Sequence, residues 1–285
     1  MIHYKLNDGN KIPAIGLGVY LQSSEQAEQS ATIAFNNGYR LIDTANLYEN
    51  EAAVGRAVNN SKVERKKIFV TSKLWPDKYK YEDAIEAVED TLERMNLAYI
   101  DLFLLHQPYK EYMEAWRALE YLAKEGKIRS IGLSNFYGEE LDEILNNAEI
   151  KPAVLQVECQ IYYQQKELKE KLKKEKILLE SWFPLGHGDK KMLTEPLLLE
   201  LSQKYKKSTT QILLRWQIQS GNIVIPGGRT EEHIKANIDI FDFKIDKEDM
   251  ERLATLDCGK SYNDFPEPIL KASYLARHPN PENDL

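Results

Sequence analysis

The segment Ile100-Asp101-Leu102-Phe103-Leu104-Leu105-His106 carries the pattern on which the fold prediction rests. It is an almost continuously apolar run, and a short run of this kind is typical of a strand in a parallel sheet that is buried on both faces. Similar runs recur along the chain. Together with this one they make eight, at residues 15–19, 40–44, 68–72, 100–106, 128–133, 153–157, 177–180 and 222–225.

The stretches between these runs show the spacing of helices. Ala84, Val88, Leu92 and Met95 recur at intervals of three and four residues, which places them on one helix face. Strands that alternate with helices predict an α/β fold, and eight such units predict a closed (β/α)8 TIM barrel. The alternative is an open doubly wound sheet, which usually has a glycine-rich turn after its first strand. Gly16-Leu17-Gly18 lacks the third glycine of that turn, so the barrel is favoured.

Both termini are expected to add to this barrel. Residues 4–6 and 12–15 flank the turn sequence Asn7-Asp8-Gly9-Asn10, and they predict an N-terminal hairpin that plugs the barrel bottom. After Gly259, several prolines without clear periodicity predict a loose C-terminal tail over the active site. Since barrels commonly run to ~250 residues, we expect residues 1–285 to form a single domain.

One connection is longer than a barrel needs. The segment 184–207 exceeds an ordinary strand-to-helix loop, and long loops in compact domains are usually functional. Its residues 195–205 have the pattern of an additional helix.

Composition limits the function classes. The chain has 285 residues, of which 42% are hydrophobic and 29% are charged, and its net charge is −7, so we expect no nucleic-acid partner. Residues 169–176 are basic but alternate with other types like a solvated helix face. Cys159 and Cys258 have no paired spacing, which predicts neither a disulfide framework nor a cysteine metal site. With no signal-peptide or membrane-span pattern, we expect a cytoplasmic protein without a membrane partner.

Ionisable residues follow three neighbouring predicted strands. Asp43 ends the second strand and Tyr48 lies in its loop, while Lys73 and His106 end the third and fourth strands. Active-site groups of such barrels come from these strand ends. A lysine beside a tyrosine favours its phenolate, and an aspartate holds the lysine charged. The four residues therefore predict a phenol that donates a proton near neutral pH, with a histidine that orients a substrate carbonyl.

With these residues in place, the chain resembles the aldo-keto reductase family over nearly its whole length, and in particular its bacterial, diketogluconate-reductase-like or prostaglandin F synthase-like branch. Several separated motifs carry the resemblance. They are Gly38-Tyr39-Arg40-Leu41-Ile42-Asp43-Thr44-Ala45, Tyr48, Glu51-Ala52-Ala53-Val54-Gly55, Thr71-Ser72-Lys73-Leu74-Trp75, Met95-Asn96-Leu97-Ala98-Tyr99-Ile100-Asp101-Leu102 and Leu105-His106.

The resemblance implies NAD(P)H-dependent reduction of aldehydes and ketones, which can run in reverse as alcohol oxidation. It makes Tyr48 the general acid, tuned by Lys73 and Asp43, and gives His106 the task of orienting the carbonyl. It implies no metal. For the substrate it implies a small carbonyl compound in an aromatic pocket. The expected lining is Tyr20, Tyr48, Trp75, His106, Tyr109 or Pro108, and tail residues such as Tyr262 or Phe265.

The resemblance also implies a cofactor site for NADP(H), with NAD(H) possible. Ser134, Asn135 and Gln156 match the polar residues that hold the carboxamide, Trp182 takes the place of the stacking aromatic, and the following loop crosses the pyrophosphate. The full set of expected cofactor residues is Gly18, Val19, Asp43, Ser134, Asn135, Gln156, Trp182, Phe183, Pro184, Leu185, Gly186, Ile225, Pro226, Gly227, Gly228, Arg229, Thr230, His233 and Asn237.

The last strand departs from the family pattern. Gly227 and Gly228 replace the usual lysine and serine, and His233 and Ala236 replace an arginine and a glutamate. A phosphate monoester requires cations or backbone donors, so recognition of the 2′-phosphate falls to Arg229 and the amides of the Gly-Gly turn.

Two other functions are weighed against catalysis by this site. A non-catalytic NAD(P)H-binding sensor or regulatory subunit would not require all four ionisable residues together. A metal-dependent barrel hydrolase requires several histidine or carboxylate ligands at strand ends, and among the five histidines only His106 is expected there. The expected assembly is a monomer or a weak homodimer.

Overall fold

The computed structural model describes residues 1–263 and 267–284, and its centre is a barrel of eight parallel strands. Neighbouring strands follow chain order. The barrel closes between its first and last strands through the parallel bridges Ile15–Val224 and Gly18–Gly227, so the predicted barrel is confirmed and the open doubly wound sheet is wrong. The strands are β3 (Leu17–Gly18), β4 (Leu41–Asp43), β5 (Phe69–Leu74), β6 (Ile100–Leu105), β7 (Ile128–Ser134), β8 (Val154–Glu158), β9 (Leu178–Trp182) and β10 (Ile223–Val224).

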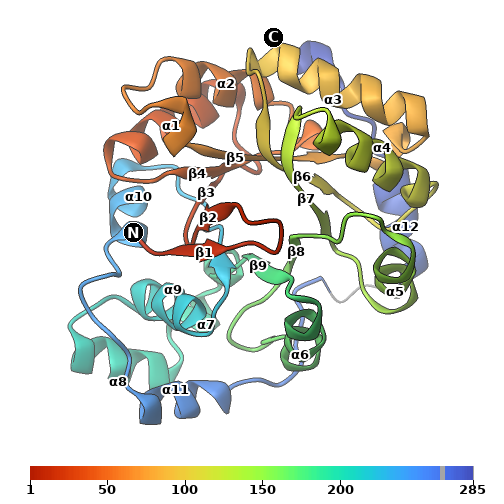
Figure 1. The fold of residues 1–285 in the computed structure, drawn as a ribbon. Helices are drawn as coiled ribbons and strands as arrows, with labels where there is room; N and C mark the ends of the chain where they lie inside the picture. The colour runs from red at the N-terminus through yellow and green to blue at the C-terminus, as the bar shows by residue number, and fades with distance from the viewer. Residues whose placement is uncertain (264–266, 285) are drawn as a thin grey trace.

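Helices surround the strands as an outer layer (Figure 1). Their apolar faces are buried as the spacing predicts, and Ala84, Val88, Leu92 and Met95 all lie in the core. Gly55 lets α2 approach α3 closely, because an added Cβ would lie 2.3 Å from the carbonyl oxygen of Met95. The helices of this layer are α1 (Ser24–Asn36), α2 (Glu51–Asn59), α3 (Tyr81–Met95), α4 (Tyr112–Lys124), α5 (Gly138–Asn147), α6 (Lys166–Glu175), α9 (Thr209–Gln219), α10 (Glu231–Ile238) and α11 (Lys247–Ala254).

The N-terminal hairpin closes one end of the barrel, as predicted. Its strands β1 (His3–Lys5) and β2 (Lys11–Pro13) pair antiparallel, and Figure 1 shows them across the barrel opening. Leu6 and Ile12 are buried against apolar side chains of the barrel interior. The Asn7 side chain donates to the carbonyl of Pro152 at 2.8 Å, which fastens the hairpin to the barrel rim.

Two further segments differ in how well the sequence predicted them. The long segment after β9 contains α7 (Lys190–Leu193) and α8 (Pro196–Tyr205), and the second is the helix expected there. The tail is more regular than predicted, because it forms α12 (Glu267–Leu275). It is also fastened, since the Trp75 indole donates to the carbonyl of Arg277 at 2.8 Å and both oxygens of the Asp284 carboxylate accept from the Ala52 amide. No helix among residues 1–263 and 267–284 is long and apolar enough to cross a membrane.

Candidate active site

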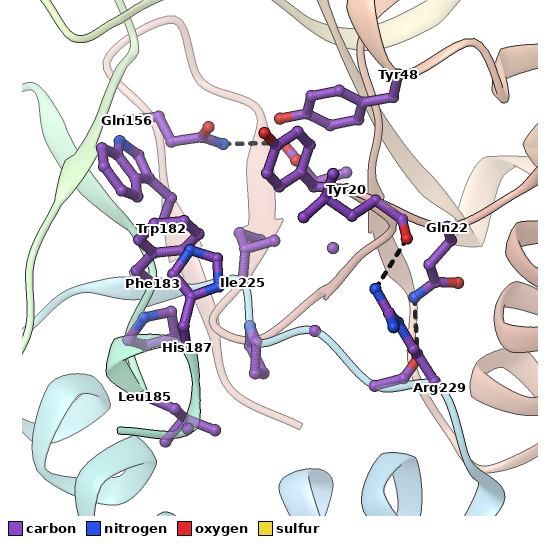
Figure 2. A pocket seen from close by; sticks show the side chains of 18 of the residues that line it. Tyr20, Gln22, Tyr48, Gln156, Trp182, Phe183, Leu185, His187, Ile225 and Arg229 are labelled. Atoms are coloured by element: carbon purple, nitrogen blue, oxygen red, sulfur yellow. Dashed lines mark hydrogen bonds between the residues drawn. The ribbon is translucent and has the colours of Figure 1, made fainter. Parts of the chain in front are cut away.

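A cavity of about 960 Å³ opens at the carboxyl ends of the strands (Figure 2). Strand ends and the loops that follow them supply most of its lining, as a barrel of this type predicts. Twenty-one residues of the predicted site line it: Gly18, Tyr20, Asp43, Tyr48, Trp75, His106, Ser134, Asn135, Gln156, Trp182, Phe183, Pro184, Leu185, Ile225, Pro226, Gly227, Gly228, Arg229, Thr230, His233 and Asn237.

Four predicted site residues lie outside this lining. Lys73 is fully buried behind it, because β5 extends to Leu74 and holds this side chain inside the barrel. Val19 and Gly186 are buried next to lining residues. Tyr109 lies one layer further out, with its ring centroid 6.2 Å from that of Tyr274.

The tail contributes residues other than those expected. Tyr262 lies outside the lining, and its hydroxyl donates to Asp189, while Phe265 lies outside the described residues. Asn263, Tyr274 and Arg277 line the cavity instead.

Tyr48, Lys73 and Asp43 form a connected group. The Lys73 ammonium donates to Asp43 Oδ1 at 2.6 Å, to the carbonyl of Thr44 at 2.8 Å and to the Tyr48 hydroxyl at 3.3 Å. All three hydrogen atoms of the ammonium therefore have acceptors. The Lys73 cation, which has no solvent contact, is therefore held beside the Tyr48 phenol.

The pKa values within this group differ from the simplest expectation. Burial, which outweighs the nearby Lys73 cation, raises the pKa of Tyr48 to about 12, so the phenol is protonated at neutral pH. Burial alone would lower the pKa of Lys73, but Asp43 and Tyr48 overcome that effect and leave it raised. The free protein thus holds a neutral phenol beside a permanent cation, whereas the sequence suggested a phenol shifted towards phenolate.

His106 lies against Tyr48 and Trp75. Its ring meets theirs edge-on, with centroid distances of 5.8 Å and 4.9 Å. Burial and the positive charges of Lys73 and Arg277 hold the pKa of His106 well below its ordinary value, so the imidazole is neutral. Its Nδ1 is buried without a hydrogen-bond partner in the described part of the chain.

Asn135 ties two walls of the cavity together. Its Oδ1 accepts from the Trp182 indole at 2.9 Å, and its Nδ2 donates to the carbonyl of His106 and to the Ser134 hydroxyl, each at 3.1 Å. The residue predicted to hold a ligand amide directly is therefore engaged with the protein. It fixes the indole of Trp182 and the backbone at His106, directly after β6.

Gln156 belongs to a second polar group. Its Nε2 donates to Asp43 Oδ2 at 2.8 Å and also to Oε1 of Glu180. Burial and repulsion from Asp43 raise the pKa of Glu180 to about 8. Sequence reasoning missed Glu180, although a glutamate at the end of an otherwise apolar run was a signal for it.

Two loops meet at the far end of the cavity. The Arg229 guanidinium donates to the carbonyl of Leu21 at 2.9 Å, and the Gln22 side chain donates to the carbonyl of Gly228 at 3.1 Å (Figure 2). Thr230 caps the N-terminus of α10 by accepting from the amide of His233.

Sequence reasoning also missed other parts of the lining, mostly because loop and tail residues have no periodic pattern. His187 lines the cavity without having been expected there, and His233 lines it as expected. No group of three or more potential metal ligands is present within the described ranges. The residues not anticipated are Leu21, Gln22, Leu47, Gln107, His187, Gly188, Leu193, Thr210, Asn263, Tyr274 and Arg277.

Comparisons with known proteins agree with this geometry. The model of the Aldo/keto reductase family matches residues 14–257. The chain belongs to this family. It is 43% identical to the glyoxal reductase of Bacillus subtilis over 93% of this chain and 96% of that protein, and 40% identical to the methylglyoxal reductase DkgA of Escherichia coli K12 over 92% and 96%. An aldo-keto reductase from a Medee basin deep-sea metagenome superposes with a TM-score of 0.89 at 39% identity, covering 93% of this chain and 97% of that one.

As an aldo/keto reductase, the chain is an oxidoreductase that acts on carbonyl groups with a nicotinamide cofactor. The cavity suits such a cofactor at both ends. Near Gln156 and Trp182 it offers polar side chains beside an aromatic ring. At the other end, an added Cβ on Gly227 would meet only the Gly18 carbonyl, at 3.9 Å. This open glycine next to the N-terminus of α10 leaves space and backbone donors for an anionic group.

Proposed function

We propose that this aldo/keto reductase reduces small aldehydes and ketones with NADPH, using Tyr48 as the general acid. The contact of the Tyr48 hydroxyl with the buried Lys73–Asp43 pair carries the proposal. A neutral phenol that faces a cavity, with a cation 3.3 Å from its oxygen, is suited to releasing a proton only when a nearby oxygen gains negative charge. We further propose that residues 1–285 act as one domain and as a monomer or weak homodimer.

In the proposed mechanism, the bound cofactor supplies the hydride. Tyr48 donates its proton to the carbonyl oxygen as negative charge develops there. Lys73 stabilises the phenolate left behind, and Asp43 keeps Lys73 charged and in place. Because Lys73 has no solvent contact, its charge acts on the phenol with little screening.

The neutral state of His106 gives it a matching role. A neutral imidazole carries one N–H donor, which orients the carbonyl oxygen towards Tyr48. Trp75 and Tyr20 supply the aromatic walls beside it. Glyoxal and methylglyoxal, which name two of the relatives, are carbonyl compounds of the size that this arrangement favours.

For the cofactor we propose NADP(H), with NAD(H) as a weaker substitute. The 2′-phosphate is assigned to Arg229, the amides of the Gly227–Gly228 turn and His233. Among these groups Arg229 is always charged and can form bidentate bonds. Since one of its N–H groups already contacts Leu21, the expected preference for NADPH is moderate.

The decisive experiment measures NADPH and NADH consumption with glyoxal, methylglyoxal and larger aldehydes. Turnover supports the reductase, whereas cofactor binding without turnover would support a sensor or regulatory subunit.

Arg229→Ala should weaken NADPH binding about ten- to a hundredfold and leave NADH binding almost unchanged. Arg277→Ala, which removes a cation from the other end of the cavity, is the control and should not alter the ratio of the two affinities. Equal weakening of both cofactors by Arg229→Ala would overturn the 2′-phosphate assignment.

A further inference from the structure

Glu180 is a buried carboxyl group that the proposed reaction does not use. It lies in the middle of β9, its side chain has no solvent contact, and it is absent from the cavity lining. Its Oε1 accepts from Gln156, while its Oε2 is buried without a hydrogen-bond partner in the described part of the chain. A buried, half-satisfied carboxyl group is costly, so its one hydrogen bond requires an explanation.

That hydrogen bond determines the orientation of the Gln156 amide. The amide has two N–H groups, and both point at carboxyl oxygens, one of Asp43 and one of Glu180. Rotating the amide by half a turn would place its oxygen against these two acceptors instead. The Gln156 side chain lines the cavity, and its Oε1 receives no hydrogen bond from the described residues. The atom left available for a ligand is therefore the carbonyl oxygen.

We propose that Glu180 is a positioning residue that, together with Asp43, orients Gln156 so that its Oε1 accepts a hydrogen bond from the carboxamide N–H of the nicotinamide. This rests on the proposed function, because the carboxamide must bind at this end of the cavity. One acceptor alone would let the amide rotate about a single hydrogen bond. Two acceptors, from strands β4 and β9, fix the plane of the amide.

The protonation state of Glu180 suits this role. With the pKa of Glu180 raised to about 8, its carboxyl group is mostly neutral at neutral pH. It then accepts from Gln156 without placing a second negative charge beside the Asp43–Lys73 pair. Glu180→Gln keeps a neutral carbonyl at this position, so it is the conservative variant, whereas Glu180→Leu removes the acceptor.

The test measures NADPH and NADH dissociation constants by quenching of tryptophan fluorescence, without substrate. Glu180→Leu should weaken both cofactors about two- to tenfold, the effect of one hydrogen bond, and Glu180→Gln should stay within twofold of the parent. Glu120→Leu is the matched control, because Glu120, on α4, is also buried and accepts from two N–H groups, the Trp116 indole and the Ile150 amide. It should lower thermal stability without changing either constant.

A double-mutant cycle separates positioning from a general structural effect. If Glu180 acts through Gln156, Glu180→Leu should have no further effect on binding in a Gln156→Ala background. Additive effects, or parental binding by Glu180→Leu, would overturn the proposal. A parent protein that binds neither cofactor would instead overturn the proposed function. If Glu180→Leu does not fold, Glu180→Met, which is unbranched, takes its place in the cycle.

Discussion

The two ends of the barrel place their cations differently. At the carboxyl end of the strands, Lys73 and Asp43 are buried and paired at 2.6 Å. At the amino end, the hairpin closes the barrel with Leu6 and Ile12, and cations stay at the rim. They line a smaller cavity of about 500 Å³ that includes Lys11, Arg40, Lys66, Lys67 and Arg129. The buried Asp101 carboxylate also lines it, and it pairs with the partly exposed Arg65 guanidinium at 2.8 Å.

The difference shows how one barrel separates stability from chemistry. A charge in solvent adds little to the free energy of folding, so the exposed cations at the rim have little effect on the stability of the hairpin end. A charge buried in a fixed geometry acts strongly on its neighbours, but it must be satisfied at every hydrogen-bonding position. We therefore expect substitutions at the carboxyl end to change mainly rates, and substitutions at the hairpin end to change mainly stability.

The largest expected effect lies at the carboxyl end. Tyr48→Phe removes the proton donor and should lower the reduction rate roughly 10²- to 10⁴-fold, with NADPH affinity almost unchanged. Lys73→Met should act similarly, since the phenolate would lose its cation. Steady-state kinetics and cofactor titration measure both. Tyr39→Phe is the control, because this buried hydroxyl donates to the carbonyl of Ile234 and contacts none of Asp43, Tyr48, Lys73 and His106. If Tyr48→Phe reduced carbonyl substrates at the parental rate, Tyr48 would not be the general acid.

At the hairpin end we expect a loss of stability instead. Ile12 is fully buried, so Ile12→Ala should lower the free energy of unfolding by about 2–5 kcal/mol, measured by denaturant titration. Lys11→Ala, next to it but exposed, should change it by no more than about 0.5 kcal/mol. The kcat of folded Ile12→Ala should match that of the parent, and a large change in kcat would mean that the two ends are not independent.

The last effect is a difference in pH dependence. The pKa of Glu180, raised by burial from its ordinary 4.5 to about 8, means that the unfolded chain ionises this group first. Its contribution to stability is therefore complete below about pH 4.5 and is lost as the pH rises towards 8, by at most about 1.4 kcal/mol per pH unit. Glu180→Gln should flatten this decline in denaturant titrations between pH 5 and 8.

An exposed glutamate at the opposite end provides the contrast. Hydrogen bonds from Lys66 and Lys67 lower the pKa of Glu64. Its small contribution to stability therefore increases, rather than decreases, as the pH rises. Glu64→Gln should leave the decline of the unfolding free energy between pH 5 and 8 as steep as in the parent. An equal flattening by both variants would mean that burial does not distinguish the two ends.

The sequence predicted the barrel because its strands are buried on both faces and so appear as apolar runs. It also predicted Asp43, Tyr48 and His106 in the cavity, since strand ends are easily located from such runs. The sequence was a poorer guide to properties that depend on residues distant along the chain but close in space. Burial cannot be read from the sequence, and it raises the Tyr48 pKa where the sequence suggested a lower one. The helix α12 was not predicted, because several prolines in the tail indicated irregular structure.

The sequence also did not predict which side chains contact one another across the barrel. Asn135 was predicted as a ligand-binding residue, and the sequence did not indicate that its amide also contacts the indole of Trp182 and the backbone of His106. Glu180 was taken only as the end of a strand. The pairing of Gln156 with Asp43 and Glu180 joins three strands, and no local pattern specifies which side chains meet there.

The fastening of the tail has a practical consequence for handling the protein. Asp284 binds the first turn of α2 through the Ala52 amide, and Asn283 donates to Glu49 at 2.8 Å, while Arg277 in the same tail lines the cavity. An affinity tag or fluorescent reporter fused behind this tail would adjoin these contacts, in the same tail that brings Arg277 to the cavity. The same fusion ahead of Met1 would extend from the hairpin at the opposite end. Amino-terminal fusion and surface immobilisation through that end are therefore the appropriate formats for assays of this enzyme.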